Sequence, residues 1–219
     1  MNDGSTHHTL DLHPAASARP GRAAAWMVLC LLLAPLIVSP ASAKESTQEK
    51  IAKLKAAYLL NFCRYVEWPE EVFEHSESPI VVGVVGEDEM GPILDHTLAE
   101  RKVRGRPLVA RRYQAPPRKD DEDERARQAA LDELAGELRG VQLLFFTDAE
   151  RDSAEAILDR TASQPILLVG DGQRYLELPT MLDLVFTDNR MVFYARREAL
   201  RDSVLKVSSH LLRLAQLID

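Results

Sequence analysis

The sequence predicts a single α/β domain, built on a mostly parallel, doubly wound sheet that is flanked by helices and carries an antiparallel hairpin at one edge. Along residues 44–219, short apolar runs alternate with amphipathic stretches, as expected for parallel strands joined by helices. Two later runs are separated by three turn-forming residues, which is typical of a hairpin. This length is enough for one good hydrophobic core, and we see no internal repeat or second domain.

The first expected element is a deeply buried helix that begins near Ser46 or Thr47, either of which can cap it. Its apolar residues recur at helical spacing, and the other faces around residues 56–63 are apolar too. The spaced residues are Ile51, Leu54, Tyr58, Phe62 and Tyr65. We expect the helix to end at Trp68, because the residue before Pro69 is disfavoured in the α region.

Four segments are predicted to form buried strands, the first because its continuous β-branched run is typical of a strand covered on both faces. They lie at residues 80–86, 107–113, 141–147 and 165–169. Helices are expected at residues 90–100, 124–138 and 149–161, and a loop at 114–124.

The end of the chain predicts a hairpin and a final helix. Residues 182–186 and 190–194 flank the turn Thr187-Asp188-Asn189. From Glu198 onward, apolar residues at spacings of three and four predict one helix whose stripe must dock on the domain. The stripe consists of Leu200, Val204, Val207, Leu211, Leu214 and Ile218.

Residues 1–43 have the three parts of a secretory signal peptide. Arg19 and Arg22 precede an uncharged apolar run over residues 23–38, and 41–43 read Ala-Ser-Ala. The run is shorter than the roughly 20 residues that a membrane span needs. The alternative is an uncleaved anchor; we favour cleavage after Ala43, which leaves a periplasmic domain at residues 44–219.

Charge and cysteine content narrow the function of that domain. Cleavage removes two basic and two acidic residues, so the net charge stays at −7. A negative exported domain is a poor candidate for binding nucleic acid.

Cys30 leaves with the signal peptide, so Cys63 has no intrachain partner and we expect no disulfide. Burial of Cys63 as a small hydrophobe is favoured over an intermolecular bridge.

Nothing in residues 44–219 has the pattern of a catalytic or metal site. There is no G-x-S-x-G, H-E-x-x-H, C-x-x-C or G-x-G-x-x-G. His75, His96 and His210 are not spaced for a metal ion or a triad. We therefore expect no enzyme activity, no metal and no cofactor.

Acidic and glycine residues follow several of the expected strands. Gly86, Asp88, Asp148 and Asp171 should lie near one rim, because ligands of doubly wound sheets bind outside the carboxyl ends of the strands. An acidic rim disfavours anionic ligands and leaves an acid-lined cation site as an alternative, but ordinary turn chemistry explains the same residues more simply.

A basic segment and two aromatic residues are the candidates for a partner surface. The segment is Arg101, Lys102, Arg104, Arg106, Arg111 and Arg112, and it is either a solvated edge or a docking face. We expect partner contacts at Trp68 and Phe73, taken as exposed apolar residues near the end of the first helix, and at Arg106, Arg111 and Arg112. The alternative for Trp68 is a place in the core.

Asn61 is a polar residue on the apolar stripe of the first helix. A buried amide without a partner costs about 1–3 kcal/mol, so we expect Asn61 to form a structural hydrogen bond.

Residues 55–69, KAAYLLNFCRYVEWP, resemble the opening signature of the YfiR-like family of periplasmic proteins. Residues 80–86, 105–112, 141–146 and 208–215 resemble later parts of that family in the same order. The sequence departs from the family at residues 178–182, where a Gly-Gly-Met-Ile-like turn is usual, and at Arg196, where an Asn is expected. Val141 stands where a paired Cys is often found, so redox sensing through an intrachain bridge is not supported.

The resemblance implies an α/β domain without known enzymatic activity. Its best-understood member represses a membrane-bound diguanylate cyclase by binding the periplasmic part, which lowers cyclic di-GMP and favours motility over biofilm. Related domains are fused to sensor kinases. Our first hypothesis is a periplasmic regulator that binds an inner-membrane cyclase or histidine kinase, and homodimerisation is left open. The second is a small-ligand sensor acting on a sensor histidine kinase, and the third, a hydrolase, is the least favoured.

Overall fold

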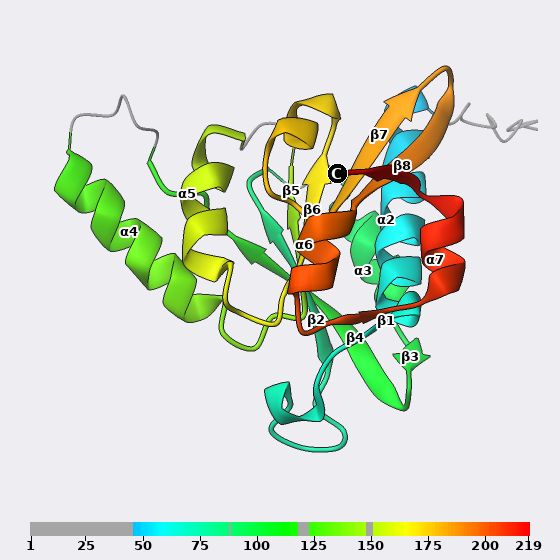
Figure 1. Ribbon diagram of the computed structural model, residues 1–219, viewed down its shortest axis with the longest axis horizontal. Coiled ribbons are helices and arrows are strands. Elements are labelled where there is room, and N and C mark those ends of the chain that lie inside the picture. The colour runs from blue at the N-terminus through cyan, green and yellow to red at the C-terminus, as the bar shows by residue number, and fades with distance from the viewer. Residues whose placement is uncertain (1–45, 88, 118–122, 148–150) are drawn as a thin grey trace, which may run out of the picture. The chain divides into compact units, whose positions relative to one another are not determined.

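The computed structural model describes residues 46–87, 89–117, 123–147 and 151–219, and its strands form two sheets (Figure 1). The strands are β1 (Val66–Glu67), β2 (Ile80–Val85), β3 (Lys102–Val103), β4 (Arg106–Tyr113), β5 (Leu143–Phe146), β6 (Leu167–Asp171), β7 (Leu182–Thr187), β8 (Arg190–Arg196), β9 (Lys206–Val207) and β10 (Gln216–Ile218). Within these ranges, eight strands form the main sheet in the order β10-β8-β7-β6-β5-β2-β4-β3, and β1 pairs with β9 in a small second sheet.

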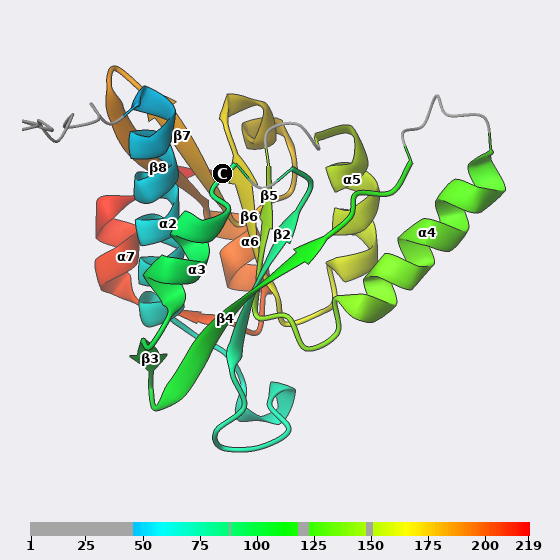
Figure 2. The same ribbon diagram turned by 180° about the vertical axis from the view of Figure 1, so that it is seen from behind.

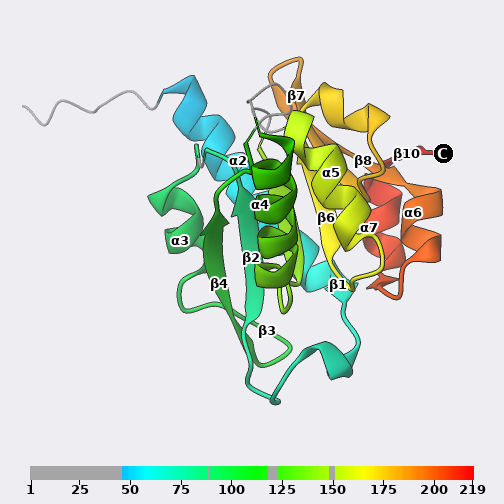
Figure 3. The same cartoon turned by 90° about the vertical axis from the view of Figure 1, so that its left-hand side faces the viewer.

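Helices cover both faces of the main sheet. They are α2 (Thr47–Tyr65), α3 (Pro92–Leu98), α4 (Glu124–Glu137), α5 (Arg151–Thr161), α6 (Arg197–Asp202) and α7 (Ser209–Leu214), with short 3-10 turns η1 (Glu70–Val72) and η3 (Gln173–Glu177). Helices α4 and α5 lie side by side on one face, in front of the sheet in Figure 3. Helices α2 and α3 pack together on the opposite face, where α3 also contacts β4 (Figure 2). The predicted doubly wound α/β domain is confirmed.

Strand directions agree with the predicted mostly parallel sheet. Strands β4, β2, β5, β6 and β7 are parallel neighbours, and β8 runs antiparallel to β7 as the predicted hairpin. The chain passes from β2 to β4 on one side and then crosses to β5 on the other. This order places the topological switch point between β2 and β5, and the carboxyl ends of the parallel strands at a single edge of the sheet.

Helix α2 begins as expected but ends earlier than expected. The Ser46 side chain accepts a hydrogen bond from the backbone N–H of Glu49 at 3.0 Å, which caps the first turn. The helix stops at Tyr65, three residues before Trp68, because Val66 and Glu67 are extended and pair with β9. Its buried face packs on β8, with the Phe62 ring 5.4 Å from that of Phe193.

The prediction of one long C-terminal helix is wrong. Residues 197–218 instead form α6, β9, α7 and β10 in succession. Ser203 ends α6, and its hydroxyl donates to the Leu200 carbonyl at 2.8 Å. Ser208 caps α7 by accepting from the His210 N–H at 3.2 Å. The expected stripe therefore does not dock as a unit, and Val204 and Leu214 remain 63% and 62% exposed.

Candidate functional site

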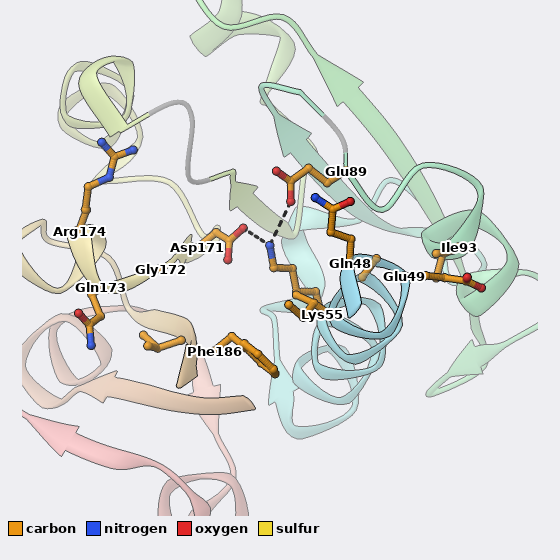
Figure 4. A pocket seen from close by; sticks show the side chains of 13 residues that line it. Gln48, Glu49, Lys55, Glu89, Ile93, Asp171, Gly172, Gln173, Arg174 and Phe186 are labelled. Carbon is orange, nitrogen blue, oxygen red and sulfur yellow. Dashed lines mark hydrogen bonds and ion pairs between the residues drawn. The ribbon is translucent and has the colours of Figure 1, made fainter. Parts of the chain in front are cut away.

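A cavity of about 830 Å³ opens at the edge of the sheet where the parallel strands end (Figure 4). Its walls come from α2, from the end of β6, from η3 and from β7, with Glu89 and Ile93 completing it. Ile51, Ala52, Val185 and Phe186 supply apolar surface, whereas Gln48 and Gln173 supply side-chain amides. This mixture of apolar walls and a few polar groups is usual for a site that binds a small molecule.

A buried ion pair lies in this cavity. The Lys55 Nζ is 2.5 Å from the Asp171 Oδ2, and the two residues are only 8% and 6% exposed. The Lys55 Nζ is also 3.5 Å from the Glu89 Oε2, whose side chain faces solvent. Burying two opposite charges costs desolvation energy that their attraction only partly repays. The pair links α2 to the end of β6 and places an ammonium and a carboxylate in the wall of the cavity.

The expected ligand rim is brought together only in part. Asp171 lines the cavity. Gly86 follows β2 with a φ of 97°, its N–H donates to the Tyr113 carbonyl at 3.3 Å, and it does not line the cavity. Asp88 and Asp148 lie outside the described residues. The cavity thus lies at the carboxyl ends of β6 and β7 rather than at the switch point.

A buried polar cluster joins β6, η3 and β7. The Asp183 carboxylate accepts a hydrogen bond from the Thr180 hydroxyl at 2.7 Å. Gly170 lies opposite Asp183 across the two strands. The Tyr175 ring stacks on Phe146, and its hydroxyl donates to the Thr147 carbonyl at 2.8 Å. The cluster fixes η3, which forms one wall of the cavity.

Burial raises the pKa of Asp183 from 3.8 to about 6, although the Thr180 hydroxyl, the Arg196 charge and the Gly170 N–H each lower it. Because this pKa is higher in the folded state, the folded protein holds the proton more tightly between about pH 4 and pH 6. The free energy of unfolding should therefore fall as the pH rises through this range, by about 3 kcal/mol from this group.

We expect Asp183→Asn to remove this pH-dependent loss, because the amide does not titrate. Urea unfolding of both proteins from pH 4 to pH 7.5 measures it. The free energy of unfolding of the variant should rise relative to that of the wild type as the pH rises. Subtracting the two values at each pH cancels the contributions of the other titrating groups, which both proteins share. A difference that stays constant across this pH range would contradict the prediction.

Trp68, Phe73 and Arg106 are brought together, but two of them are not exposed. The expected exposure of Trp68 is wrong: the ring is buried, and its Nε1–H donates to the Gln142 carbonyl at 2.7 Å. Arg106 is also buried, with its guanidinium 3.7 Å above the half-buried Phe73 ring. Arg106 donates to the His75 carbonyl at 2.7 Å and pairs with Glu70 at 2.7 Å. These contacts hold the segment between β1 and β2 in place.

Arg111 and Arg112 point to opposite faces of β4, because side chains alternate along a strand. Arg112 faces α3, where its guanidinium binds both carboxylate oxygens of Asp95 at 2.6 and 2.9 Å. Arg111 lines a hollow of about 190 Å³ together with Phe73 and Arg139. The five expected partner contacts therefore do not form one continuous surface.

Asn61 and Cys63 have different environments on α2. Asn61 is half-buried, and its side-chain oxygen accepts a hydrogen bond from the exposed Arg64 at 3.4 Å, so its structural role stays a prediction. Cys63 is fully buried as expected. Burial raises the pKa of its thiol to about 12, which disfavours the thiolate and makes Cys63 a poor nucleophile.

The C-terminal segment forms an apolar groove that the sequence pattern does not predict. The groove has a volume of about 510 Å³ and is lined by Leu200, Leu205, Val207, Leu212 and Leu217, with Arg197 and Arg201 also present. Leu217 is 41% exposed, and the exposed Val204 and Leu214 belong to the same segment. Clustered exposed apolar side chains of this kind commonly mark interaction surfaces. The groove is not evident from the sequence, because the spacing of these apolar residues favours one docked helix.

In the part of the chain that the structure describes, no group of three or more His, Cys, Asp or Glu side chains is placed to hold a metal ion. No helix in those ranges is both long and apolar enough to cross a membrane.

The YfiR/HmsC-like family model matches residues 52–216, from within α2 to the first residue of β10. The chain belongs to the YfiR/HmsC-like family. This family is regulatory rather than catalytic, and membership implies a periplasmic regulator in cyclic di-GMP signalling. The resemblance found in the sequence is confirmed.

Other comparisons are more distant. A conserved domain protein of known structure from Vibrio cholerae O1 biovar El Tor strain N16961 is 12% identical, with a TM-score of 0.48. The match covers 77% of this chain and 60% of that protein, so the chain spans less than two thirds of its length. No curated protein matches the chain.

Proposed function

We propose that this protein inhibits a membrane-bound diguanylate cyclase by binding the cyclase's periplasmic domain. The observation that carries the proposal is the family match over residues 52–216. A periplasmic protein can reach only the outer part of a membrane receptor, so it must act through contacts on that part.

We propose that residues 1–43 are a signal peptide that is cleaved after Ala43. The periplasmic form should then begin at Lys44, because Ala41 and Ala43 present the small side chains that a signal peptidase requires. Intact mass measurement of the periplasmic fraction tests this, with Ala43→Phe as a variant that should block cleavage. A wild-type chain that keeps residues 1–43 in the membrane fraction would instead establish an uncleaved anchor.

We place the cyclase contact on the C-terminal groove and its exposed neighbours Val204, Leu214 and Leu217. These side chains are apolar and accessible, and apolar burial is the main driving force of protein association. Arg197 and Arg201 add positive charge at the groove, which suits a partner segment that combines apolar and acidic residues. Phe73 and Arg111, which line one hollow, remain proposed as a second contact region, and Arg112, on the other face of β4, remains proposed as a separate contact.

Deleting the gene should raise cellular cyclic di-GMP, and the wild-type gene should restore the lower level. A Val204→Asp/Leu214→Asp variant should fold but fail to restore it, because both positions are solvent-facing and their burial against the partner would be lost. The matched control is Leu54→Asp, because Leu54 is also an exposed apolar residue but lies on α2, away from the groove. This variant should restore the lower cyclic di-GMP level. An unchanged cyclic di-GMP level in the deletion strain would count against cyclase inhibition.

The second candidate function is a small-ligand sensor that acts on a sensor histidine kinase. The specific observation in its favour is the cavity of about 830 Å³ with the buried Lys55–Asp171 pair. In that case deletion would change phosphorylation of the kinase's response regulator and leave cyclic di-GMP unaltered.

A further inference from the structure

We propose that the cavity beside Lys55 and Asp171 binds a neutral, polyhydroxylated small molecule, a sugar or a polyol. The inference concerns a ligand site and goes beyond the proposed regulation, whichever membrane protein is the partner. It rests on the charge balance of the cavity, on its hydrogen-bonding groups and on its size.

Charge balance argues against a ligand with net charge. The acidic residues among the described lining are Glu49, Glu89 and Asp171. Lys55 is paired with Asp171 and lies near Glu89, and Glu49 is paired with Lys53 at 2.9 Å. Arg174, the other basic residue of this lining, points away from the Lys55–Asp171 pair in Figure 4. The two buried charges of the cavity, those of Lys55 and Asp171, are paired with each other, so a charged ligand would have to compete with this pairing.

A zwitterion also fits poorly. Its two ends need one positive and one negative side chain, each able to form an ion pair with the ligand. The buried charges here are 2.5 Å apart and bonded to each other, so a zwitterion would have to separate them. The two buried groups would have to move apart before the ligand's own charges could replace their direct contact.

The remaining hydrogen-bonding capacity suits hydroxyl groups. Gln48 and Gln173 each carry an amide that both donates and accepts. The Lys55 ammonium only donates and the Asp171 carboxylate only accepts, and a hydroxyl can satisfy either kind of group because it does both. Phe186 and Ile51 provide apolar surface for the C–H face of a sugar ring. The volume of about 830 Å³ lies within the usual range for small-molecule sites, about 300–1,000 Å³.

The test is an amide NMR titration of the ¹⁵N-labelled protein with glucose, N-acetylglucosamine, maltose and myo-inositol, each up to tens of millimolar. Sodium phosphate, spermidine and alanine at the same concentrations represent an anion, a cation and a zwitterion. We expect saturable shifts at Gln48, Lys55, Gln173 and Phe186 with at least one hydroxylated compound, and none with the three charged compounds. Response to the saccharides and not to inositol identifies a sugar, and the reverse identifies a polyol.

Gln173→Ala and Phe186→Ala should each weaken binding at least tenfold, whereas Gln114→Ala, at an exposed glutamine outside the cavity lining, should not. Lys55→Met/Asp171→Asn replaces the pair by neutral groups and should fold yet lose binding. The proposal is overturned if no hydroxylated compound shifts these amides, if a charged compound does so instead, or if the cavity variants bind as tightly as the wild type. None of these outcomes bears on cyclic di-GMP in the deletion strain, so this inference and the proposed function fail separately.

Discussion

Replacing Lys55 with methionine is expected to lower the free energy of unfolding by about 3–5 kcal/mol, the usual cost of removing one partner of a buried ion pair. The methionine retains most of the apolar stem but removes the ammonium that lies 2.5 Å from the Asp171 carboxylate. Both side chains are at least nine-tenths buried, so water cannot readily take the place of the ammonium. Urea unfolding at pH 7 measures the loss.

Lys53 provides a matched control on the same helix. Its ammonium is 2.9 Å from Glu49, but both side chains are about half exposed, and exposed pairs of this kind contribute about 0.3–0.5 kcal/mol. Lys53→Met should therefore have little effect. Lys55→Met/Asp171→Asn should recover much of the stability that Lys55→Met loses, since neither substituted group carries a charge. A loss below about 1 kcal/mol for Lys55→Met, or no recovery in the double variant, would show that the pair does not hold α2 to β6.

Local patterns were enough to predict six of the eight strands described in the main sheet, namely β2 and β4 to β8, but not β3 or β10. Residues 80–85 form β2 almost where the apolar run lies, because a run of β-branched residues fits a strand covered on both faces. The turn at Asp188 and Asn189 adopts positive φ at both positions, which Asp and Asn tolerate better than most residues. In these segments the local preference and the final environment agree, so the sequence alone locates the element.

The C-terminal segment could not be predicted in the same way, because its structure depends on a distant part of the chain. Lys206 and Val207 pair with Glu67 and Val66 across about 140 residues, and the Ser208 N–H donates to the Tyr65 carbonyl at 2.9 Å. That pairing interrupts the helix that the apolar spacing favours. The same pairing ends α2 before Trp68 and places the Trp68 ring in the core.

Only one partner of the ion pair in the cavity could be predicted from the sequence. Asp171 was expected at the rim, because it follows an apolar strand. Lys55 was not selected, although it lies among the buried residues Ala52, Ala56 and Leu59 of α2. A lone charged residue within an apolar helical face is the signal that could have indicated it. Its partner comes from a strand 116 residues away, which no local pattern shows.

The second large effect is expected at Gly170, where an added Cβ has no room. An alanine Cβ would lie 2.5 Å from the Asp183 Oδ1 and closer still to the Cβ and Cγ of Tyr175. The Tyr175 atoms lie next to its backbone, and the side chain is buried and hydrogen-bonded to the Thr147 carbonyl, so Tyr175 cannot rotate away. Gly170→Ala should therefore cost at least about 3 kcal/mol, the upper end of the usual cost of overpacking a core.

Gly83 and Gly136 are the controls for this prediction, because an added Cβ has more room at each of them than at Gly170. At Gly83 the added Cβ would be 2.9 Å from the Leu144 Cδ1 and 3.0 Å from the Tyr113 Cε2, both at the ends of side chains that can shift. Gly136 in α4 has nothing within 4 Å, so alanine there should be neutral or stabilising by up to about 1 kcal/mol. Urea unfolding should rank the loss as Gly170→Ala, then Gly83→Ala, then Gly136→Ala. If Gly170→Ala were as stable as Gly136→Ala, then η3 would not be packed against β6 through Tyr175, and this wall of the cavity would be free to move.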